Sequence, residues 1–263
     1  MTTPVILIHG MWCTGASWQR VNDLLTGRGY HCFAPTLLGH EPSTDQPLRV
    51  ARLGLADYLD DLQAQIAAQA FTERPILIGH SMGGLLAQQL AARIDPLALV
   101  LLTPAPPSGI NGLSGSTIAA FAPWMASGAF WRRAYKPRFE RAVLSLFPGL
   151  PSERHRPLYE TLVHESGRAI AEIAFWWLDF SRAAAAPASD VHCPVYVVSC
   201  ERDRLTPRSV VRKIATRHAH ATQRIYPDRG HWVIDDDQTE EMMHGICSWL
   251  WPIQRREQHR AQG

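Results

Sequence analysis

Residues 76–84 read Ile76-Leu77-Ile78-Gly79-His80-Ser81-Met82-Gly83-Gly84, and this stretch decides the fold. It joins an apolar run typical of a buried strand to the pattern Gly-x-Ser-x-Gly and the start of a helix. A serine on a sharp turn between strand and helix is held where a base and backbone donors can reach its hydroxyl. Glycines at positions 79 and 83 favour this turn, because a Cβ atom there would clash. The alternative for Ser81 is an ordinary helix N-cap, and the flanking strand, helix and second glycine favour the sharp turn.

Length and composition indicate one domain that carries an insert. With 263 residues, 46% of them hydrophobic, the chain can bury a full core. The net charge of +2 comes from arginines scattered among acidic residues, which argues against nucleic acid and favours a small neutral partner. The five cysteines lack Cys-x-x-Cys spacing, which predicts free thiols in a reducing compartment. The first residues lack the basic segment of a signal peptide and no apolar stretch is long enough for a membrane span, so we expect a cytoplasmic protein.

Short apolar runs alternate with helical patterns over most of the chain. This alternation predicts an α/β fold with a mostly parallel sheet and helices on both faces. The expected strands cover residues 5–8, 30–34, 75–78, 97–102, 195–199 and 221–226. The expected helices cover residues 17–25, 53–70, 82–94, 207–217 and 238–250. The last segment, residues 252–263, is polar and is expected to fray.

The exception is the segment 104–190, which is irregular and rich in proline and aromatic residues. We therefore divide the chain into a core, residues 1–103 and 191–263, and a helical insert, residues 104–190. The insert follows the strand after the Ser81 turn, so it would cover the carboxyl ends of the strands, where open α/β sheets bind ligands. Most of its aromatic side chains should pack as its own core and a minority should face a pocket. Trp124 and Trp131 are the pocket candidates.

The order of these motifs resembles the α/β-hydrolase superfamily over nearly the whole chain. Val5-Ile6-Leu7-Ile8-His9-Gly10-Met11-Trp12 is similar to the family's His-Gly oxyanion segment. The Ser81 turn, the aromatic insert, an acid loop at residues 194–207 and Gly230-His231-Trp232 follow in the family's order. The resemblance implies the α/β-hydrolase fold with a helical cap, or lid, and hydrolase activity without a cofactor. Little chain precedes the His-Gly strand, so the family's first two strands would be missing, as in the compact plant-esterase and hydroxynitrile-lyase group.

The resemblance also implies a role for each site residue. Ser81 would attack a carbonyl, His231 would carry its proton to the leaving group, and Asp203 would hold the imidazole in the right tautomer. Glu201 is the alternative carboxylate, for which a solvated surface position is favoured. Cys200 departs from the family's usual glycine at the turn before the acid. The backbone N–H groups of Met11 and Met82 would form the oxyanion hole.

The remaining candidates are weighed against simpler roles. Trp12 would border the acyl pocket or pack in the core, and Trp232 is a further pocket candidate. Hydroxynitrile lyases of the compact group carry lysine at the position of Trp232, which argues against that activity. Among the 12 histidines, we expect His9 and His80 to be structural and His218 and His220 to lie on the surface. We expect Asp235, Asp236 and Asp237 to form a charge cluster at a helix N-terminus.

The sequence thus predicts a serine hydrolase that cleaves a carboxylic ester of moderate size and mainly apolar character through an acyl-enzyme. The alternatives are an acyl thioesterase, a lactonase, a hydrolase of carbon–carbon bonds, and a non-catalytic binding protein on the same fold. No metal-ligand pattern and no dinucleotide motif occurs, so we expect neither a metal nor a cofactor. The expected partner is a small-molecule ester, joined by an acyl carrier if the protein is a thioesterase.

Overall fold

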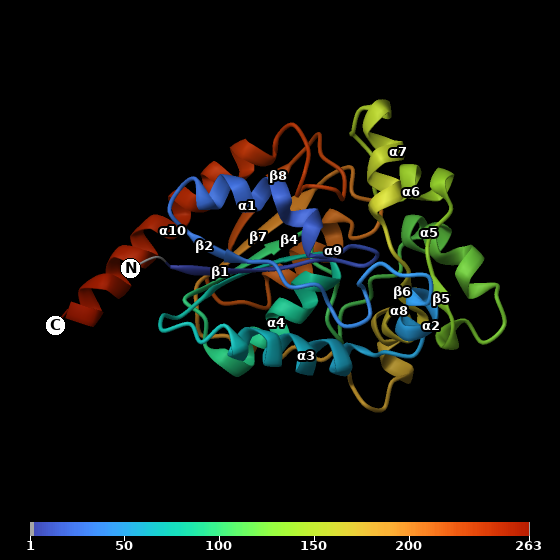
Figure 1. Ribbon diagram of the computed structural model, residues 1–263, viewed down its shortest axis with the longest axis horizontal. Coiled ribbons are helices and arrows are strands. Elements are labelled where there is room, and N and C mark those ends of the chain that lie inside the picture. The colour runs from blue at the N-terminus through green and yellow to red at the C-terminus, as the bar shows by residue number, and fades with distance from the viewer. Residues whose placement is uncertain (1–2, 263) are drawn as a thin grey trace.

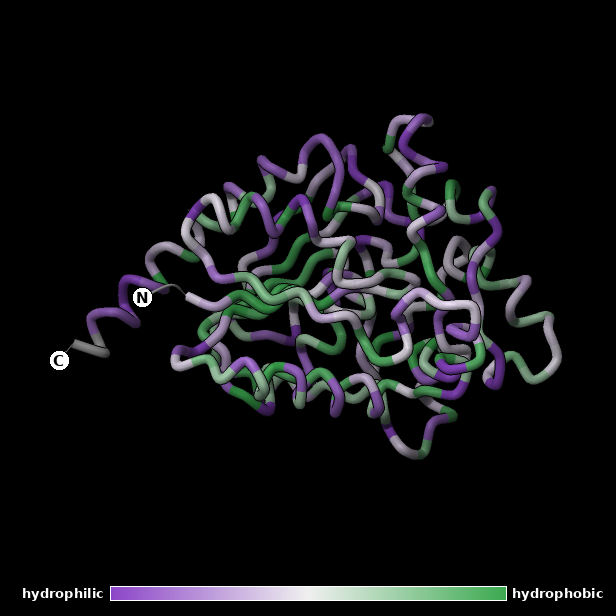
Figure 2. The backbone as a smooth tube through the Cα atoms, viewed as in Figure 1, coloured by the Kyte–Doolittle hydropathy of each residue, from purple (hydrophilic) through white to green (hydrophobic). Residues whose placement is uncertain are grey.

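A six-stranded sheet forms the centre of the computed structural model, which describes residues 3–262 (Figure 1). Its strands are β1 (Pro4–Ile8), β2 (His31–Phe33), β3 (Ile76–His80), β4 (Ala98–Leu102), β7 (Val195–Cys200) and β8 (Thr222–Tyr226). They lie in the order β2-β1-β3-β4-β7-β8, and every neighbouring pair is parallel. The four central strands are buried throughout, which explains their continuous apolar sequences (Figure 2). The predicted parallel sheet is confirmed.

Helices cover both faces of this sheet, as predicted. One face packs against α3 (Leu55–Ala68), α4 (Met82–Ile94) and α9 (Arg208–Ala215). The other face packs against α1 (Gln19–Thr26), which follows a 3-10 turn, η1 (Gly15–Trp18), and against α10 (Thr239–Gln262). A short helix, α2 (Gln46–Val50), was not predicted, because five residues are too few to show a helical period.

The C-terminal helix α10 is longer than the sequence indicates. The expected fraying from Pro252 onward is wrong, because the helix continues to Gln262. Ile253 is buried against the core. The Gln254 amide accepts from the Tyr30 hydroxyl at 2.9 Å and donates to Thr3 at 2.9 Å, which ties the helix to the start of the sheet. These tertiary contacts keep the segment helical, although its polar sequence alone would not form a stable helix. Gly263 lies outside the described residues.

Residues 104–190 contribute no strand to the main sheet and gather beyond the carboxyl ends of its strands (Figure 1). We call this segment the cap. Its α-helices are α5 (Gly115–Met125), α6 (Phe139–Ser145), α7 (Ser152–Thr161) and α8 (Gly167–Ala174). Three 3-10 turns accompany them: η2 (Phe130–Arg132), η3 (Trp176–Leu178) and η4 (Ala188–Asp190). Two very short strands, β5 (Ala134–Tyr135) and β6 (Glu165–Ser166), pair in antiparallel fashion, and two residues are too few to show a strand pattern.

A buried polar cluster joins the cap to the core. The Glu165 carboxylate lies 3.1 Å from His40 Nε2 and accepts from the Tyr58 hydroxyl at 2.7 Å, and all three residues are fully buried. Burial alone would lower the pKa of His40, but the facing carboxylate outweighs burial and holds this pKa above its usual value. The carboxylate thus favours the protonated form of the His40 imidazole, and removing either partner would leave the other polar group buried without its contact.

The described residues also bear on cysteine chemistry and membrane spans. All five cysteines are free, as predicted. Within residues 3–262 no helix is both long and apolar enough to cross a bilayer. In the same range no three His, Cys, Asp or Glu side chains come together as a metal-binding group.

Candidate active site

Ser81 occupies a strained turn between β3 and α4. Its φ of 54° and ψ of −121° lie in a region that side-chain-bearing residues rarely adopt and that costs about 1–3 kcal/mol. Backbone hydrogen bonds keep Ser81 in this strained conformation. Ser81 N–H donates to the Leu102 carbonyl at 3.0 Å, and the Ser81 carbonyl accepts from Ala105 N–H at 2.8 Å. The turn thus presents the hydroxyl at the carboxyl end of the central strand.

Three glycines allow the backbone segments to approach this turn. A Cβ atom on Gly79 would collide with the Gly83 carbonyl, and one on Gly83 with the Ile8 carbonyl. The predicted steric reason for both glycines is therefore confirmed. A Cβ atom on Gly10 would lie 2.9 Å from that of Ser81, so the His-Gly loop lies directly against the serine.

Asp203 and His231 meet above the sheet from the loops that follow β7 and β8. His231 Nδ1 donates to Asp203 Oδ2 at 2.8 Å, and both side chains are buried. Asp203 Oδ1 accepts from the backbone N–H groups of Leu205 and Thr206 at 2.8 and 2.9 Å. Since Nδ1 carries the proton, Nε2 is the nitrogen left to accept one. No hydrogen bond joins Ser81 Oγ to His231 among residues 3–262, and this contact is often loose before substrate binds.

Thr206 anchors the acid and was missed by sequence reasoning. Its hydroxyl lies 2.8 Å from Asp203 Oδ2 and 3.0 Å from the Thr103 carbonyl. The sequence analysis placed Thr206 only within the acid loop, residues 194–207, and a threonine three residues after an acid is the signal that could have identified its role.

Glu201 and Cys200 take no part in the site. Glu201 is exposed and pairs with Arg208 at 2.6 Å, as expected of a surface charge. Cys200 is the last residue of β7, in extended backbone that requires no glycine, and burial raises the pKa of its thiol to about 12.

The loop that carries His231 is held by a buried ion pair. Arg229 donates through Nε and Nη2 to the two Asp236 oxygens at 2.8 and 2.7 Å, and through Nη2 to the Val233 carbonyl at 2.8 Å. Asp236 does lie just before the N-terminus of α10, where its Oδ1 accepts from Gln238 N–H at 2.9 Å, but the prediction missed its pairing with Arg229. Asp235 instead pairs with Arg154 of α7 in the cap. Helix α10 begins only at Thr239, so these acids belong to the loop.

His9 holds the loop that carries Met11. Its Nε2 accepts from Leu37 N–H at 3.0 Å, and its Nδ1 lies 2.9 Å from the Gly10 carbonyl. Burial, with a smaller effect of His40, lowers the pKa of His9 to about 3, so the ring is neutral and Nδ1–H donates. The expected structural role of His9 agrees with these contacts.

The backbone N–H groups of Met11 and Met82 are free to meet a ligand oxygen. Met82 is the first residue of α4, so its N–H has no acceptor within the helix. The Met11 N–H donates to no backbone carbonyl among the described residues. Both flank Ser81, the arrangement that an oxyanion hole requires.

The other histidines divide between core and surface. His80 donates through Nε2 to the His231 carbonyl at 2.9 Å, and burial lowers the pKa of His80 to about 3. His218 was expected on the surface, which is wrong: it is buried with its Nε2 3.3 Å from Gln88 Oε1. Burial lowers the pKa of His218 to about 4. His220 is exposed, as expected.

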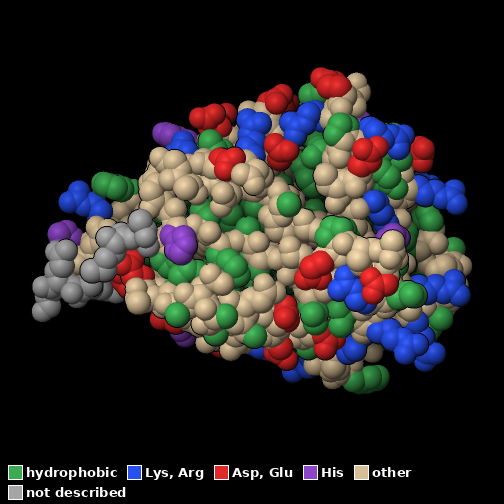
Figure 3. Space-filling view, in the orientation of Figure 1, with side chains coloured by type: hydrophobic (Ala, Val, Ile, Leu, Met, Phe, Trp, Pro, Cys, Tyr) green, Lys and Arg blue, Asp and Glu red, His purple; other side chains and the backbone are tan. Residues whose placement is uncertain are grey.

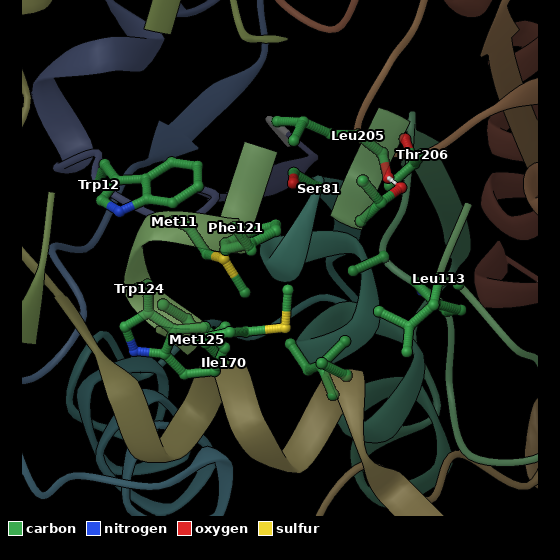
Figure 4. Close-up of a pocket in the computed structure, with 16 residues that line it drawn as sticks. Met11, Trp12, Ser81, Leu113, Phe121, Trp124, Met125, Ile170, Leu205 and Thr206 are labelled. Carbon is green, nitrogen blue, oxygen red and sulfur yellow. Dashed lines mark hydrogen bonds between the residues drawn. The ribbon is translucent and has the colours of Figure 1, made fainter. Parts of the chain in front are cut away.

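Ser81 opens into a narrow apolar pocket that is partly open to solvent (Figure 4). Core loops and the cap helices α5 and α8 supply its walls. No charged side chain lines it, and its hydroxyl groups are those of Ser81, Thr117 and Thr206. In Figure 4 the sulfur atoms of Met11 and Met125 point into the cavity. The main apolar residues are Met11, Trp12, Leu113, Phe121, Trp124, Met125, Ile170, Ile173 and Leu205.

Two of the four tryptophan candidates line this pocket. Trp12 is fixed by a hydrogen bond from Nε1 to the Tyr135 carbonyl at 2.9 Å. Trp124 is also buried and lines the same pocket. Trp131 lies outside the pocket, 47% exposed, because its 3-10 turn directs it to the outer face of the cap. Trp232 also lies outside, because its side chain packs in the core against Phe147. Met125 and Ile170 were missed, since only tertiary placement shows which face of a short apolar helix meets the site.

Fold and site together define the class of protein. Residues 5–243 match the model of the Alpha/beta hydrolase family, and the chain belongs to this family. Its relatives include hydrolases of esters. It is 40% identical over 82 residues to a pyrethroid hydrolase of Sphingobium wenxiniae, covering 31% of this chain and 28% of that protein. It is 33% identical over 123 residues to a pimeloyl-[acyl-carrier protein] methyl ester esterase of Aliivibrio salmonicida, covering 44% of this chain and 43% of that protein. The matches therefore span less than half of these relatives.

Solved structures agree on the fold. A monoacylglycerol lipase from Paleococcus ferrophilus superimposes with a TM-score of 0.70 and 20% identity, over 96% of both chains. At this identity the likeness concerns the fold.

Proposed function

We propose that this hydrolase cleaves carboxylic esters with an uncharged, apolar acyl group of moderate size, using Ser81 as nucleophile. The observation that carries the proposal is the strained Ser81 turn at the base of an apolar pocket, beside the hydrogen-bonded His231–Asp203 pair. The names of the relatives, a pyrethroid hydrolase and a methyl ester esterase, favour an ester over a thioester.

The proposed reaction has two halves. Ser81 Oγ attacks the ester carbonyl carbon while His231 Nε2 takes the hydroxyl proton, and Asp203 stabilises the imidazolium. The oxyanion accepts hydrogen bonds from the Met11 and Met82 N–H groups, each worth about 3 kcal/mol in the barrier. The imidazolium returns its proton to the alkoxide, and the alcohol leaves. Water, activated by His231, then cleaves the acyl-enzyme and releases the acid.

The lining of the pocket supports the substrate class. An acyl group that carried a charge would be buried without a partner, which is costly. Phe121, Trp124 and Met125 of α5 face Ile170 and Ile173 of α8 across the cavity, so the acyl group would lie between the two cap helices. We propose that the cap acts as the lid that shapes the acyl site.

A panel of substrates tests this proposal. We expect p-nitrophenyl esters of neutral, medium-length acids to be cleaved best, and analogues with a terminal carboxylate to lose at least about 100-fold in kcat/KM. Ile170→Trp, which narrows the pocket, should shift the optimum to shorter acyl groups. Ile118→Trp makes the same change at a 45% exposed position of α5 and should leave the optimum unchanged. Equal cleavage of the charged analogues, or a strong preference for acyl thioesters, would contradict the proposed substrate class.

A further inference from the structure

The outer face of the cap exposes large hydrophobic side chains. Trp131 is 47% exposed, Trp177 48%, Leu178 66% and Phe180 100%. Most cap aromatics were expected to pack in the core of the cap and a minority to face a pocket, and Trp131, Trp177 and Phe180 depart from this because they face solvent. Isolated exposed hydrophobic residues are ordinary, but a contiguous group of this size indicates an interaction site.

These side chains form one continuous surface. Phe130 contacts Trp131 and Phe175, with ring centroids 5.0 and 6.0 Å apart, and Phe175 lies 5.7 Å from Trp177. An open groove runs between Trp131 and the loop of Leu178 and Phe180, and Arg168, Glu172 and Asp179 also line it. We call this surface, with Phe130, Trp131, Phe175, Trp177, Leu178 and Phe180, the outer cap patch.

Unpaired cations surround the outer cap patch. Arg132, Arg133 and Arg182 are exposed and take part in no salt bridge among residues 3–262. Of the two acids in the groove, Glu172 pairs with Arg168 at 2.8 Å, whereas Asp179 is held by neutral donors such as Ser181 N–H at 3.0 Å and keeps its negative charge. Figure 3 shows basic side chains gathered at the cap end of the molecule. The patch therefore combines exposed apolar side chains with a rim that carries more arginines than acids, and its net charge is positive.

We propose that the outer cap patch docks on the surface of an anionic lipid bilayer. Tryptophan and phenylalanine suit the boundary between headgroups and acyl chains, and arginines beside them are attracted to anionic lipid. A symmetric second copy of the chain is disfavoured, because a two-fold interface would bring the same positive rim against itself. An acidic protein partner would satisfy the rim, but the fully exposed Phe180 at a loop tip fits insertion better than a flat interface.

Docking would bring the Ser81 pocket close to the lipid. Helix α8 is shared: Ile170 and Ile173 line the Ser81 pocket, whereas Arg168 and Ala171 line the groove of the outer cap patch. A helix is about 10 Å across, so only this thickness separates the pocket from the bilayer surface. The docking itself does not depend on the proposed hydrolase activity.

Vesicle flotation without substrate tests the proposal. We expect wild-type protein to float with phosphatidylglycerol vesicles, to bind phosphatidylcholine vesicles far less, and to be released by high salt. The double variant Leu178→Ser/Phe180→Ser should lose at least about tenfold in partition coefficient. Arg182→Gln should lose about fivefold on anionic vesicles alone. Trp251→Ser, at a 63% exposed position on α10, is the matched control and should bind as the wild type does.

Folding and activity controls keep the test decisive. The double variant should cleave a water-soluble ester at the wild-type rate, because neither residue lines the Ser81 pocket, and should melt at the wild-type temperature. If that rate is zero in the wild type as well, the proposed function fails while the flotation result still stands. Absence of binding to phosphatidylglycerol, or equal binding by the double variant, would overturn the docking proposal. So would a dimer that the double substitution dissociates.

Discussion

Asp203 determines which nitrogen of His231 can accept a proton. Its carboxylate receives Nδ1–H at 2.8 Å and is itself held by two backbone N–H groups. Asp203→Asn keeps the shape but offers an N–H where an acceptor is needed, which favours the wrong tautomer. We expect kcat to fall by about 10³- to 10⁴-fold with a small change in KM, measured by steady-state ester hydrolysis.

Glu201→Gln is the matched control for this prediction, because Glu201 is the neighbouring exposed acid. It should leave kcat within about twofold, as for an exposed ion pair. A comparable loss in both variants would show that kcat depends on the acid loop as a whole and not on the Asp203 carboxylate.

Buried neutral histidines should make the fold sensitive to acid. Burial lowers the pKa of His9 and His80 to about 3 and that of His218 to about 4. In the unfolded chain each pKa is about 6.5, so between these values the unfolded state binds protons that the folded state does not. The free energy of unfolding therefore falls as the pH drops from about 6.5 towards the folded values.

His218→Gln should remove one of these contributions. Urea unfolding at a series of pH values gives the free energy of unfolding as a function of pH. Near pH 5, the slope of this function should be smaller in His218→Gln than in the wild type by up to about 1.4 kcal/mol per pH unit. His220→Gln, at an exposed position, should leave the slope unchanged. If the free energy of unfolding had the same pH slope in wild type and His218→Gln, folding would not lower the pKa of His218.

At the scale of elements, the turn between β3 and α4 depends on the absence of side chains. Gly83→Ala would place a methyl group against the Ile8 carbonyl, so we expect it to lower the free energy of unfolding by about 1–3 kcal/mol. Gly245→Ala is the control inside α10, where the Tyr196 hydroxyl, 3.9 Å away, would be the nearest neighbour of a new Cβ atom. It should raise stability by about 0.5–1 kcal/mol. Denaturant unfolding of both variants checks the two signs, and stabilisation by Gly83→Ala would refute the steric account.

The loop between β8 and α10 depends on one of two adjacent acids. Asp236→Ala removes the partner of buried Arg229 and should cost about 3–5 kcal/mol of stability. Asp235→Ala breaks only partly exposed pairs with Arg154 and Arg20 and should cost at most about 1 kcal/mol. Thermal and urea unfolding distinguish the two. Equal costs would mean that both acids act only as a general charge cluster at the start of α10 and that the Asp236–Arg229 pair adds no stability of its own.

At the scale of the whole molecule, core and cap differ in how far their sequences predict them. The four central strands are continuous apolar runs and each long core helix has a clear period, so the parallel sheet followed from pattern alone. In the cap, strands of two residues and helices such as Phe139–Ser145 are too short to show a period. Their positions are set by distant contacts, such as the Glu165–His40 pair across 125 residues.

The same division holds within the site. Ser81, Asp203 and His231 lie in motifs with a recognisable order, and the structure brings Asp203 and His231 into contact. Met125, Ile170 and Thr206 carry no motif, and Trp131 and Trp232 were misplaced because composition does not tell which face a side chain takes. Residues whose roles depend on neighbours in sequence were predictable, and those whose roles depend on neighbours in space were not.

The central claim is that Ser81 is the nucleophile, and covalent labelling tests it most directly. The protein is treated with a fluorophosphonate and its intact mass is measured, with Ser116→Ala as a matched serine control. We predict one adduct per chain on the Ser81 peptide, present in wild type and in Ser116→Ala and absent in Ser81→Ala. A folded wild-type protein that takes up no adduct, or an adduct that persists in Ser81→Ala, would contradict the account.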